Sequence, residues 1–186
     1  MLAALAEVGM EALRIAVEAA SGWSGLLIIF VYSFLIAFIL PLPSEIVLCP
    51  VGYVCAGNTL GLALPLPVQV VIVIVTSGLG KAAGSLIALY VGHGASHSGP
   101  VIRAVQRLGF DPVEWSRKRM VALTKEYGYL GMAIGLTVPG FPDTLSIYAF
   151  SILEDDYTKF AGAAFAGSAG RLIVTIGAIE GLLIFV

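Results

Sequence analysis

The sequence predicts an all-α integral membrane protein in which two opposed re-entrant helical hairpins pack on glycine-rich transmembrane helices as an inverted repeat. Three observations predict this class. The 186 residues have a mean hydropathy of +0.98 and only 12% charged residues, whereas soluble domains carry about 25%. Two long apolar stretches are each broken midway by two prolines with an acid beside them. A basic polar segment separates the two halves.

The two breaks indicate hairpins. Each combines helix-breaking residues with a following acid, namely Pro41, Pro43 and Glu45 in the first and Pro139, Gly140, Pro142 and Asp143 in the second. Proline removes a backbone donor and clashes with the preceding helical turn. Irregular backbone at membrane depth is tolerated only where protein buries it or water reaches it. Matching breaks in two halves therefore predict a binding site near the membrane midplane, and a single kinked spanning helix at each break is the alternative.

The N-terminal residues 1–21 are expected to form an amphipathic helix, separate from a transmembrane domain at residues 22–186. Their apolar residues recur at roughly helical spacing between charged ones. Such a helix can lie on the membrane surface or pack on the helical bundle.

Two further apolar segments, residues 68–91 and 157–186, are long enough to cross a bilayer, which needs about 20 residues. Both are rich in small residues, which let membrane helices approach closely. The small residues expected at close contacts are Gly78, Gly80, Gly84 and Ser85 in the first, and Gly162, Ala163, Ala164, Ala166, Gly167, Ser168, Ala169 and Gly170 in the second.

The polar segment 93–126 is rich in Lys and Arg, and such short loops stay in the cytoplasm. This predicts a multi-pass protein of the cell membrane with that loop on the cytoplasmic side, part of it either along the interface or solvated. Neither a metal nor a cofactor is expected, because the residues around His93 and His97 offer no further ligand. The net charge of −2 gives no reason to expect nucleic acid.

Cys49 and Cys55 lie near the first break, at a spacing that matches neither a CxxC redox motif nor a zinc knuckle. Small buried thiols are the favoured interpretation of this pair. A disulfide between them is left open.

Ionisable residues within the apolar stretches form the predicted site. The expected substrate- or proton-binding residues are Glu45, Lys81, Asp143 and Arg171, with Glu180 given little weight. Each charge at membrane depth costs about 2.5–3.5 kcal/mol, so each is a functional hypothesis. If the hairpin tips meet, Glu45 and Asp143 share a cavity that favours a proton carrier. Two alternatives are left open. The acids could cap the broken helices, and the two cations could form purely structural ion pairs with these acids.

The order of these motifs resembles the DedA family, also described as the SNARE-associated or VTT-domain superfamily of membrane proteins, with this chain as a divergent member. The matching elements are Pro41-Leu42-Pro43-Ser44-Glu45, the glycine- and tyrosine-containing segment 80–92, Tyr127-Gly128, Val138-Pro139-Gly140 and Gly170-Arg171-Leu172. They cover nearly all of residues 22–186. The resemblance implies paired re-entrant helices.

The resemblance also implies translocation of a lipid or lipid-linked phosphate, by a flippase or scramblase acting on polyprenyl phosphate or a phospholipid. Proton coupling in the family is assigned to membrane acids and arginines. Glu45 and Asp143 would then carry protons or gate the cavity, while Arg171 and Lys81 neutralise the head group. The expected partners are membrane lipids, an anionic lipid or polyprenyl phosphate among them, and the proton; a homo-oligomer is left open.

Two other functions are the alternatives. The family's second break usually carries a base where this chain has Asp143, which favours a proton-coupled exporter of small amphipathic compounds. A non-transporting membrane scaffold could recruit partners through the basic segment. The sequence contains no nucleophile elbow, zinc helix or phosphate loop, so an enzyme is not expected.

Overall fold

The computed structural model describes residues 2–38, 42–55, 60–95, 128–139, 143–151 and 156–184, and every regular element in these ranges is helical. The elements are α1 (Leu2–Glu18), α2 (Gly22–Phe38), the 3-10 helix η1 (Ser44–Val51), α3 (Leu66–Ala95), the helix Gly128–Thr137, α6 (Asp143–Ser151) and α7 (Tyr157–Ile184). The predicted all-α class is confirmed for these residues.

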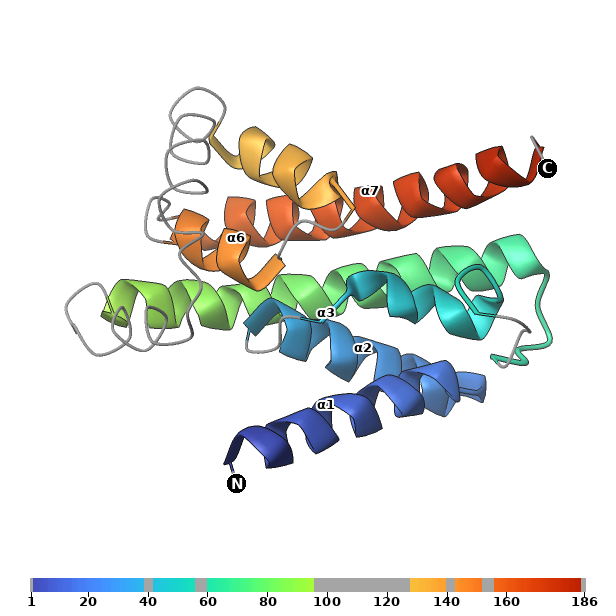
Figure 1. Cartoon of the computed structure of the whole chain (residues 1–186). Coiled ribbons are helices and arrows are strands. Elements are labelled where there is room, and N and C mark those ends of the chain that lie inside the picture. The colour runs from blue at the N-terminus through green and yellow to red at the C-terminus, as the bar shows by residue number, and fades with distance from the viewer. Residues whose placement is uncertain are drawn as a thin grey trace.

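The long helices α3 and α7 form the central pair of the molecule and run in opposite directions (Figure 1). α3 has 30 residues and α7 has 28, lengths of about 45 and 42 Å at 1.5 Å per residue. Their apolar parts, Leu66–Tyr90 and Tyr157–Leu182, are long and apolar enough to cross a membrane. Both predicted long spans are therefore helices of spanning length, whereas α2 has only 17 residues.

The first broken stretch doubles back on itself. The Gly22 amide at the start of α2 donates to the carbonyl of Leu60 (2.6 Å), and the Leu60 amide donates to the carbonyl of Pro50 near the end of η1 (3.0 Å). The Tyr32 hydroxyl donates to the carbonyl of Pro43, just before η1 (2.9 Å). These contacts hold η1 antiparallel to α2, and Figure 1 shows η1 running back beside α3.

The second broken stretch also doubles back. After α6, the amide of Asp156 donates to the hydroxyl of Tyr129, in the first turn of the helix Gly128–Thr137 (3.0 Å). The end of this stretch at Asp156 therefore lies beside its beginning at Tyr129. The predicted turn residues Pro41, Gly140 and Pro142 and most of the basic segment 93–126 lie outside the described residues.

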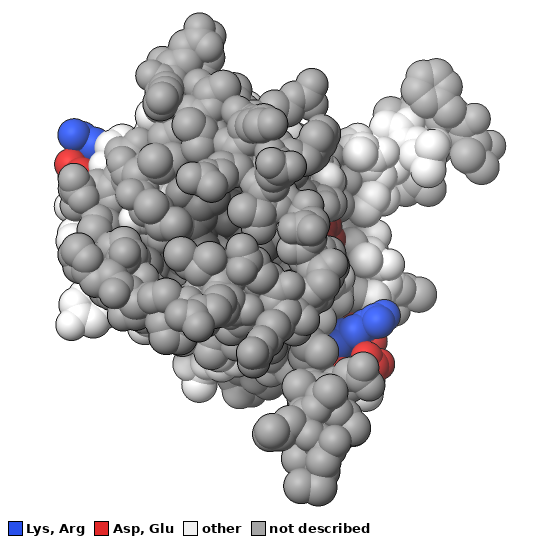
Figure 2. Space-filling view, turned by 60° about the vertical axis from the view of Figure 1, so that its left-hand side comes forward, with Lys and Arg blue, Asp and Glu red and all other residues white. Residues whose placement is uncertain are grey.

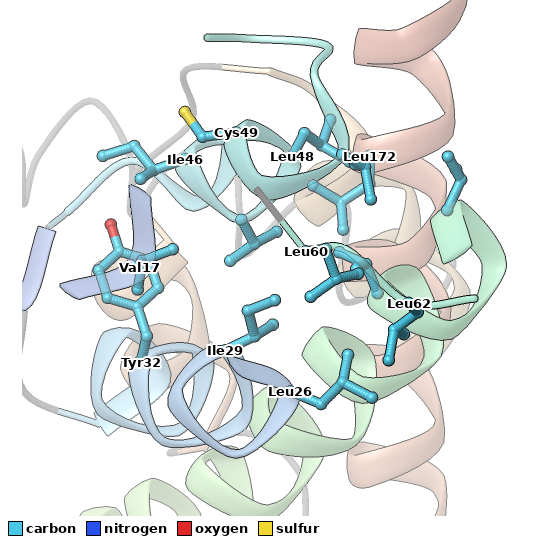
Figure 3. Close-up of a cluster of buried hydrophobic side chains, with 14 of the residues drawn as sticks. Val17, Leu26, Ile29, Tyr32, Ile46, Leu48, Cys49, Leu60, Leu62 and Leu172 are labelled. Carbon is cyan, nitrogen blue, oxygen red and sulfur yellow. The ribbon is translucent and has the colours of Figure 1, made fainter. Parts of the chain in front are cut away.

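Each doubled-back stretch has its own apolar core. The first core joins α1, α2, η1 and α3, and it receives Leu172 from α7 (Figure 3). The second joins the helix Gly128–Thr137, α6 and α7 to the facing ends of α2 and α3. Both cores include residues of α3 and α7, so the described parts of both stretches pack against the two long helices.

α1 packs on the bundle, which is one of the two arrangements that the sequence left open. Its Val17 side chain is fully buried in the first core, and Ala20, which follows the helix, is buried too. Its neighbours are α2 and η1. The boundary between an N-terminal helix and a transmembrane domain stays a prediction.

Large apolar side chains are exposed along the outer faces of the helices. Leu27 on α2, Val71 on α3 and Ile173 on α7 are all well exposed. In Figure 2, the visible described Lys and Arg side chains lie beside acidic ones at the rim. Apolar surface of this extent is unfavourable in water and suits a lipid environment.

Glycines set the helix spacing, as the sequence predicts for most of them. A Cβ atom on Gly80 of α3 would lie 2.5 Å from the carbonyl oxygen of Phe30 on α2, and one on Gly167 of α7 would lie 2.7 Å from that of Ala133. Gly162 has nothing within 4 Å of the same position, so its predicted role in close packing is wrong. The close approaches lie at the middle of the helices.

Replacing Gly80 by alanine should destabilise the fold by about 1–3 kcal/mol, because the added methyl group overpacks against backbone. Gly177→Ala on α7 is the control, because a Cβ there meets nothing within 4 Å. That variant should be neutral or up to about 1 kcal/mol more stable. Thermal unfolding of both purified variants in one detergent measures the difference, and equal unfolding temperatures would contradict the close contact.

Asp156 caps the N-terminus of α7. Its Oδ1 accepts from the backbone amides of Thr158 (3.1 Å) and Lys159 (3.2 Å), and its Oδ2 lies 3.1 Å from the Lys159 ammonium. These contacts, the amide of Lys159 foremost, lower the pKa of the Asp156 carboxyl. The ionised form is therefore favoured by folding, and its contribution is present above the unfolded pKa of about 3.9.

Asp156→Asn keeps a capping side chain but removes the charge. The wild-type protein should unfold at a higher temperature than this variant above about pH 5. The difference should shrink as the pH falls through the lowered pKa of Asp156, because the wild-type carboxyl then becomes neutral as well. Unfolding temperatures measured in parallel from pH 7 down to the acid limit test this, and a constant offset would count against it.

Candidate functional site

Two cations lie at the middle of the two long helices. Lys81 is the sixteenth of the 30 residues of α3, and Arg171 is the fifteenth of the 28 residues of α7. Only 3% of Lys81 and 2% of Arg171 is exposed. Gly80 lies next to Lys81 and Gly170 next to Arg171, so both cations sit where the helices are most closely packed.

Asp143 binds both cations. Its Oδ2 accepts a hydrogen bond from Lys81 Nζ, and its Oδ1 lies 2.6 Å from Arg171 Nη2. Asp143 is the first residue of α6 and is 5% exposed. A carboxylate is favoured at a helix N-terminus by the helix dipole. The second break therefore places a carboxylate in the interior at the N-terminus of α6, where the dipole of that helix stabilises the negative charge.

Arg171 also contacts the other ends of the broken helices. Its Nε donates to the carbonyl of Leu136 in the last turn of the helix Gly128–Thr137 (2.8 Å), where carbonyls lack helical partners. Its Nη1 lies 3.5 Å from the Ser44 hydroxyl at the start of η1, a long and weak contact. One guanidinium therefore reaches both breaks.

Glu45 follows Ser44 in the first turn of η1. It is close enough to Lys81 and to Tyr32 to interact with both electrostatically. Its Oε1 is buried, and within the described part of the chain it has no hydrogen-bond partner. A buried polar atom without a partner is rare, which makes this carboxyl oxygen a candidate to accept a hydrogen bond from a bound group.

All four predicted site residues thus belong to one cluster, in which Asp143 and Glu45 lie near the two cations Lys81 and Arg171. Glu180 does not join them: it is exposed, and its carboxylate accepts a hydrogen bond from the Tyr53 hydroxyl (3.0 Å). Sequence reasoning missed Ser44 and the carbonyl of Leu136. Ser44 could have been predicted, because its hydroxyl lies between Pro43 and Glu45 in the sequence. The carbonyl of Leu136 could not, because every residue has a backbone carbonyl.

The charges within this cluster do not balance by themselves. Lys81 and Arg171 supply two positive charges and Asp143 one negative charge, which leaves one positive charge in excess. Glu45 cancels it when ionised and leaves it uncancelled when protonated. Uptake of one proton by Glu45 together with one anion would therefore leave the total charge of the cluster unchanged.

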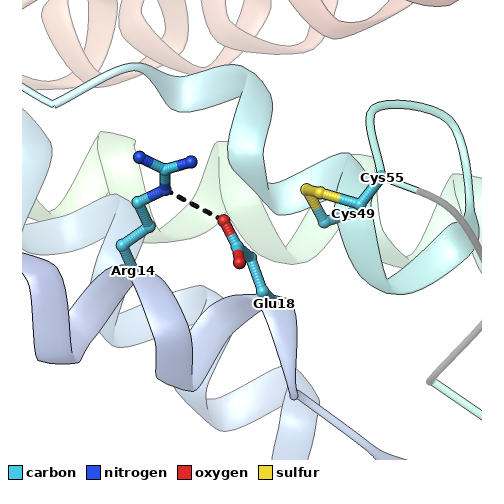
Figure 4. The surroundings of a disulfide bond; sticks show 4 residues. All are labelled: Arg14, Glu18, Cys49 and Cys55. Carbon is cyan, nitrogen blue, oxygen red and sulfur yellow. Dashed lines mark hydrogen bonds and ion pairs between the residues drawn. A yellow bond between two sulfur atoms is a disulfide. The ribbon is translucent and has the colours of Figure 1, made fainter.

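The cysteines form a disulfide, which corrects the favoured interpretation of them as thiols. Cys49 in η1 and Cys55 beyond it are bonded, and the pair lies beside the Arg14–Glu18 ion pair of α1 (Figure 4). A carboxylate oxygen of Glu18 and both sulfur atoms lie within 4.8 Å of one another. In this bonded state the sulfur atoms are not thiolate ligands for a metal.

The charge count predicts an order of stability. Asp143→Asn leaves two buried cations without their shared counter-charge and should cost roughly 3–5 kcal/mol. Lys81→Met leaves the pair of Arg171 and Asp143 and should cost less. The double variant should unfold at a higher temperature than Asp143→Asn alone, because it buries one cation fewer. Thermal unfolding in detergent gives the order, and equal loss in Asp143→Asn and Lys81→Met would contradict it.

A protein-family model, the VTT domain, matches residues 40–181 of this chain. No curated protein and no solved structure matches the chain. The family match includes both breaks, α3 and nearly all of α7, and therefore every residue of the cluster around Arg171 and Lys81. Because it also covers well over half of the sequence, the protein belongs to the VTT-domain family of membrane-associated proteins, the DedA and SNARE-associated family that its motifs resemble.

Proposed function

We propose that this protein moves a lipid or lipid-linked phosphate between the leaflets of the cell membrane, coupled to a proton. The observation that carries the proposal is the buried cluster of Lys81, Asp143 and Arg171 halfway along two membrane-length helices. A structural protein has no need of three buried charges at the depth where they cost most. The proposal assigns transport, not catalysis, to the chain.

The anionic head group would bind where Arg171 faces the two breaks. Its planar guanidinium can donate two parallel bonds to a phosphate. The N-termini of η1 and α6 face the same region, and helix N-termini favour anions. Lys81 adds a second cation, so the head group would meet positive charge from two helices and two helix ends.

The coupling follows from the charge of Glu45. While Glu45 is ionised, the cluster is neutral and an entering anion would add an uncompensated charge. Once Glu45 takes up a proton, the excess positive charge accepts one anion. Proton and anion would therefore bind and leave together.

The two doubled-back stretches would be the re-entrant hairpins of an inverted repeat. In Figure 1, α2 and η1 open toward one end of the molecule, whereas the helix Gly128–Thr137 and α6 open toward the other. Each is followed by one long helix, and these two helices are antiparallel. This order supports two units that enter the bilayer from opposite faces and meet at its midplane.

Two independent features support one orientation in the membrane. The basic segment follows the C-terminal end of α3, and Lys- and Arg-rich loops stay in the cytoplasm. The disulfide lies at the opposite end, where Leu60 joins η1 to the start of α2. Disulfides persist in oxidising compartments, so both features support the proposal that residues 93–126 lie on the cytoplasmic side.

Transport requires the cluster to open, because its three charged residues are at most 5% exposed in this structure. Each break packs with its own apolar core, and rocking of one unit against the other would expose the cluster to alternate faces. An exporter of small amphipathic compounds is the second candidate, because Asp143 could also bind a cationic substrate once freed from its two partners.

Glu45→Gln tests the coupling, because glutamine imitates the protonated acid. In proteoliposomes containing a fluorescent phospholipid or polyprenyl phosphate, wild-type protein should move the lipid faster when a pH gradient is imposed. In Glu45→Gln the increase in rate caused by the gradient should be at least about tenfold smaller, since the charge of residue 45 no longer changes. Movement of the lipid without a gradient should continue. Chemical quenching of the outer leaflet measures both rates.

Glu11→Gln is the matched control, because Glu11 lies exposed on α1 away from the cluster; it should behave as wild type. An unaltered response to the gradient in Glu45→Gln would contradict the proton-carrier role. Movement of an amphipathic dye without movement of lipid would favour the exporter, and movement of neither would favour the scaffold.

A further inference from the structure

The disulfide, Glu18 and Arg14 form a second cluster at the end of the molecule where η1 meets α1. We propose that Cys49 and Cys55 are a redox-active pair that exchanges with external thiols, with Glu18 transferring the proton of Cys49. This site is separate from the transport cluster, and its test does not depend on transport.

The geometry gives the two sulfur atoms different roles. Cys49 lies in η1 and is 2% exposed, whereas Cys55 lies beyond η1 and is partly exposed. An attacking thiolate therefore has access to the sulfur of Cys55, and the buried sulfur of Cys49 is the leaving group. Attack at an accessible sulfur atom is what distinguishes an exchangeable disulfide from a structural one.

Glu18 is held beside both sulfur atoms. Its carboxylate lies within 4.8 Å of them and accepts a hydrogen bond from Arg14 Nε at 2.9 Å. The side chains of Arg14 and Glu18 are 50% and 34% exposed, so the site is open to solvent and to a thiol. The ion pair fixes the carboxylate on the face of α1 that packs against η1 (Figure 4).

The exchange balances without a cofactor. A thiolate attacks Cys55 Sγ, the bond between the sulfur atoms breaks, and its electron pair goes to Cys49 Sγ, which takes a proton. A second thiolate then attacks the external sulfur of the mixed disulfide, and Cys55 Sγ leaves with the electron pair and takes a proton. This gives two cysteine thiols and one external disulfide. In the reverse direction the Glu18 carboxylate removes the proton of Cys49 as it attacks the mixed disulfide, which is general base catalysis.

Several charged or titratable groups in the described part of the chain interact with Glu18 or with its partners. Arg14 lies on its own helix and Tyr32 faces it from α2. Glu11 on α1 interacts with Arg14, and Glu45 at the far end of η1 interacts with Tyr32. Of these groups, Glu18 is the one whose carboxylate oxygen is placed within 4.8 Å of both sulfur atoms, so a loss of rate in Glu18→Gln would belong to this carboxylate.

The experiment follows the native full-length protein in detergent with glutathione. Millimolar reduced glutathione should open the disulfide while the protein stays folded, and mass spectrometry should find the mixed disulfide on Cys55. On addition of oxidised glutathione the bond should re-form. Glu18→Gln should slow this re-formation about tenfold near neutral pH, since a positioned base contributes at least this much. Its rate should also rise more steeply with pH, because the reaction then depends on the thiolate of Cys49 alone.

Two variants separate proton transfer from structure. Arg14→Gln breaks the same ion pair but keeps the carboxylate, so it should retain most of the rate; Glu11→Gln should match wild type. Reduction that occurs only after denaturation, with helix content followed by circular dichroism, would overturn the proposal. An unchanged pH profile in Glu18→Gln, or equal slowing in Arg14→Gln, would overturn the role of Glu18.

Discussion

The ion cluster in which Asp143 binds Lys81 and Arg171 is the constraint on which the rest of the structure depends. Buried charges are stable only when their oppositely charged partners are within contact distance. That distance requires α3 and α7 to lie close to their neighbours, which Gly80 and Gly167 permit. It also requires the broken helices to end at the same level. Close packing and broken helices are thus two consequences of one electrostatic requirement.

The cluster also bears on one position at which the chain departs from the pattern that its motifs resemble. That pattern usually has a base after the second break, whereas this chain has Asp143 there and Lys81 on the adjacent long helix. These two residues bind each other. A positive charge therefore lies beside the second break although the break itself carries an acid. The departure preserves the cationic character of the interior, which weakens the argument that Asp143 favours an exporter.

The sequence predicts those features that depend on composition and local pattern. Hydropathy predicts the long helices, paired prolines predict the breaks, and charges in apolar segments predict Lys81, Asp143 and Arg171. It could not predict which acid binds which cation, because that choice depends on the register between helices far apart in the chain. The same holds for the bond between Cys49 and Cys55, which forms because η1 ends in a left-handed turn at Gly52 that brings the two together.

The two acids at the breaks occupy similar positions in their halves but differ in their surroundings. Asp143 contacts two cations and belongs to an α-helix. Glu45 belongs to a 3-10 helix and has a buried oxygen without a hydrogen-bond partner among the described residues. Asp143 therefore joins α6 to α3 through Lys81 and to α7 through Arg171. Among the described residues Glu45 forms no such ion pair, so its carboxyl does not tie η1 to the long helices in the way that Asp143 ties α6 to them.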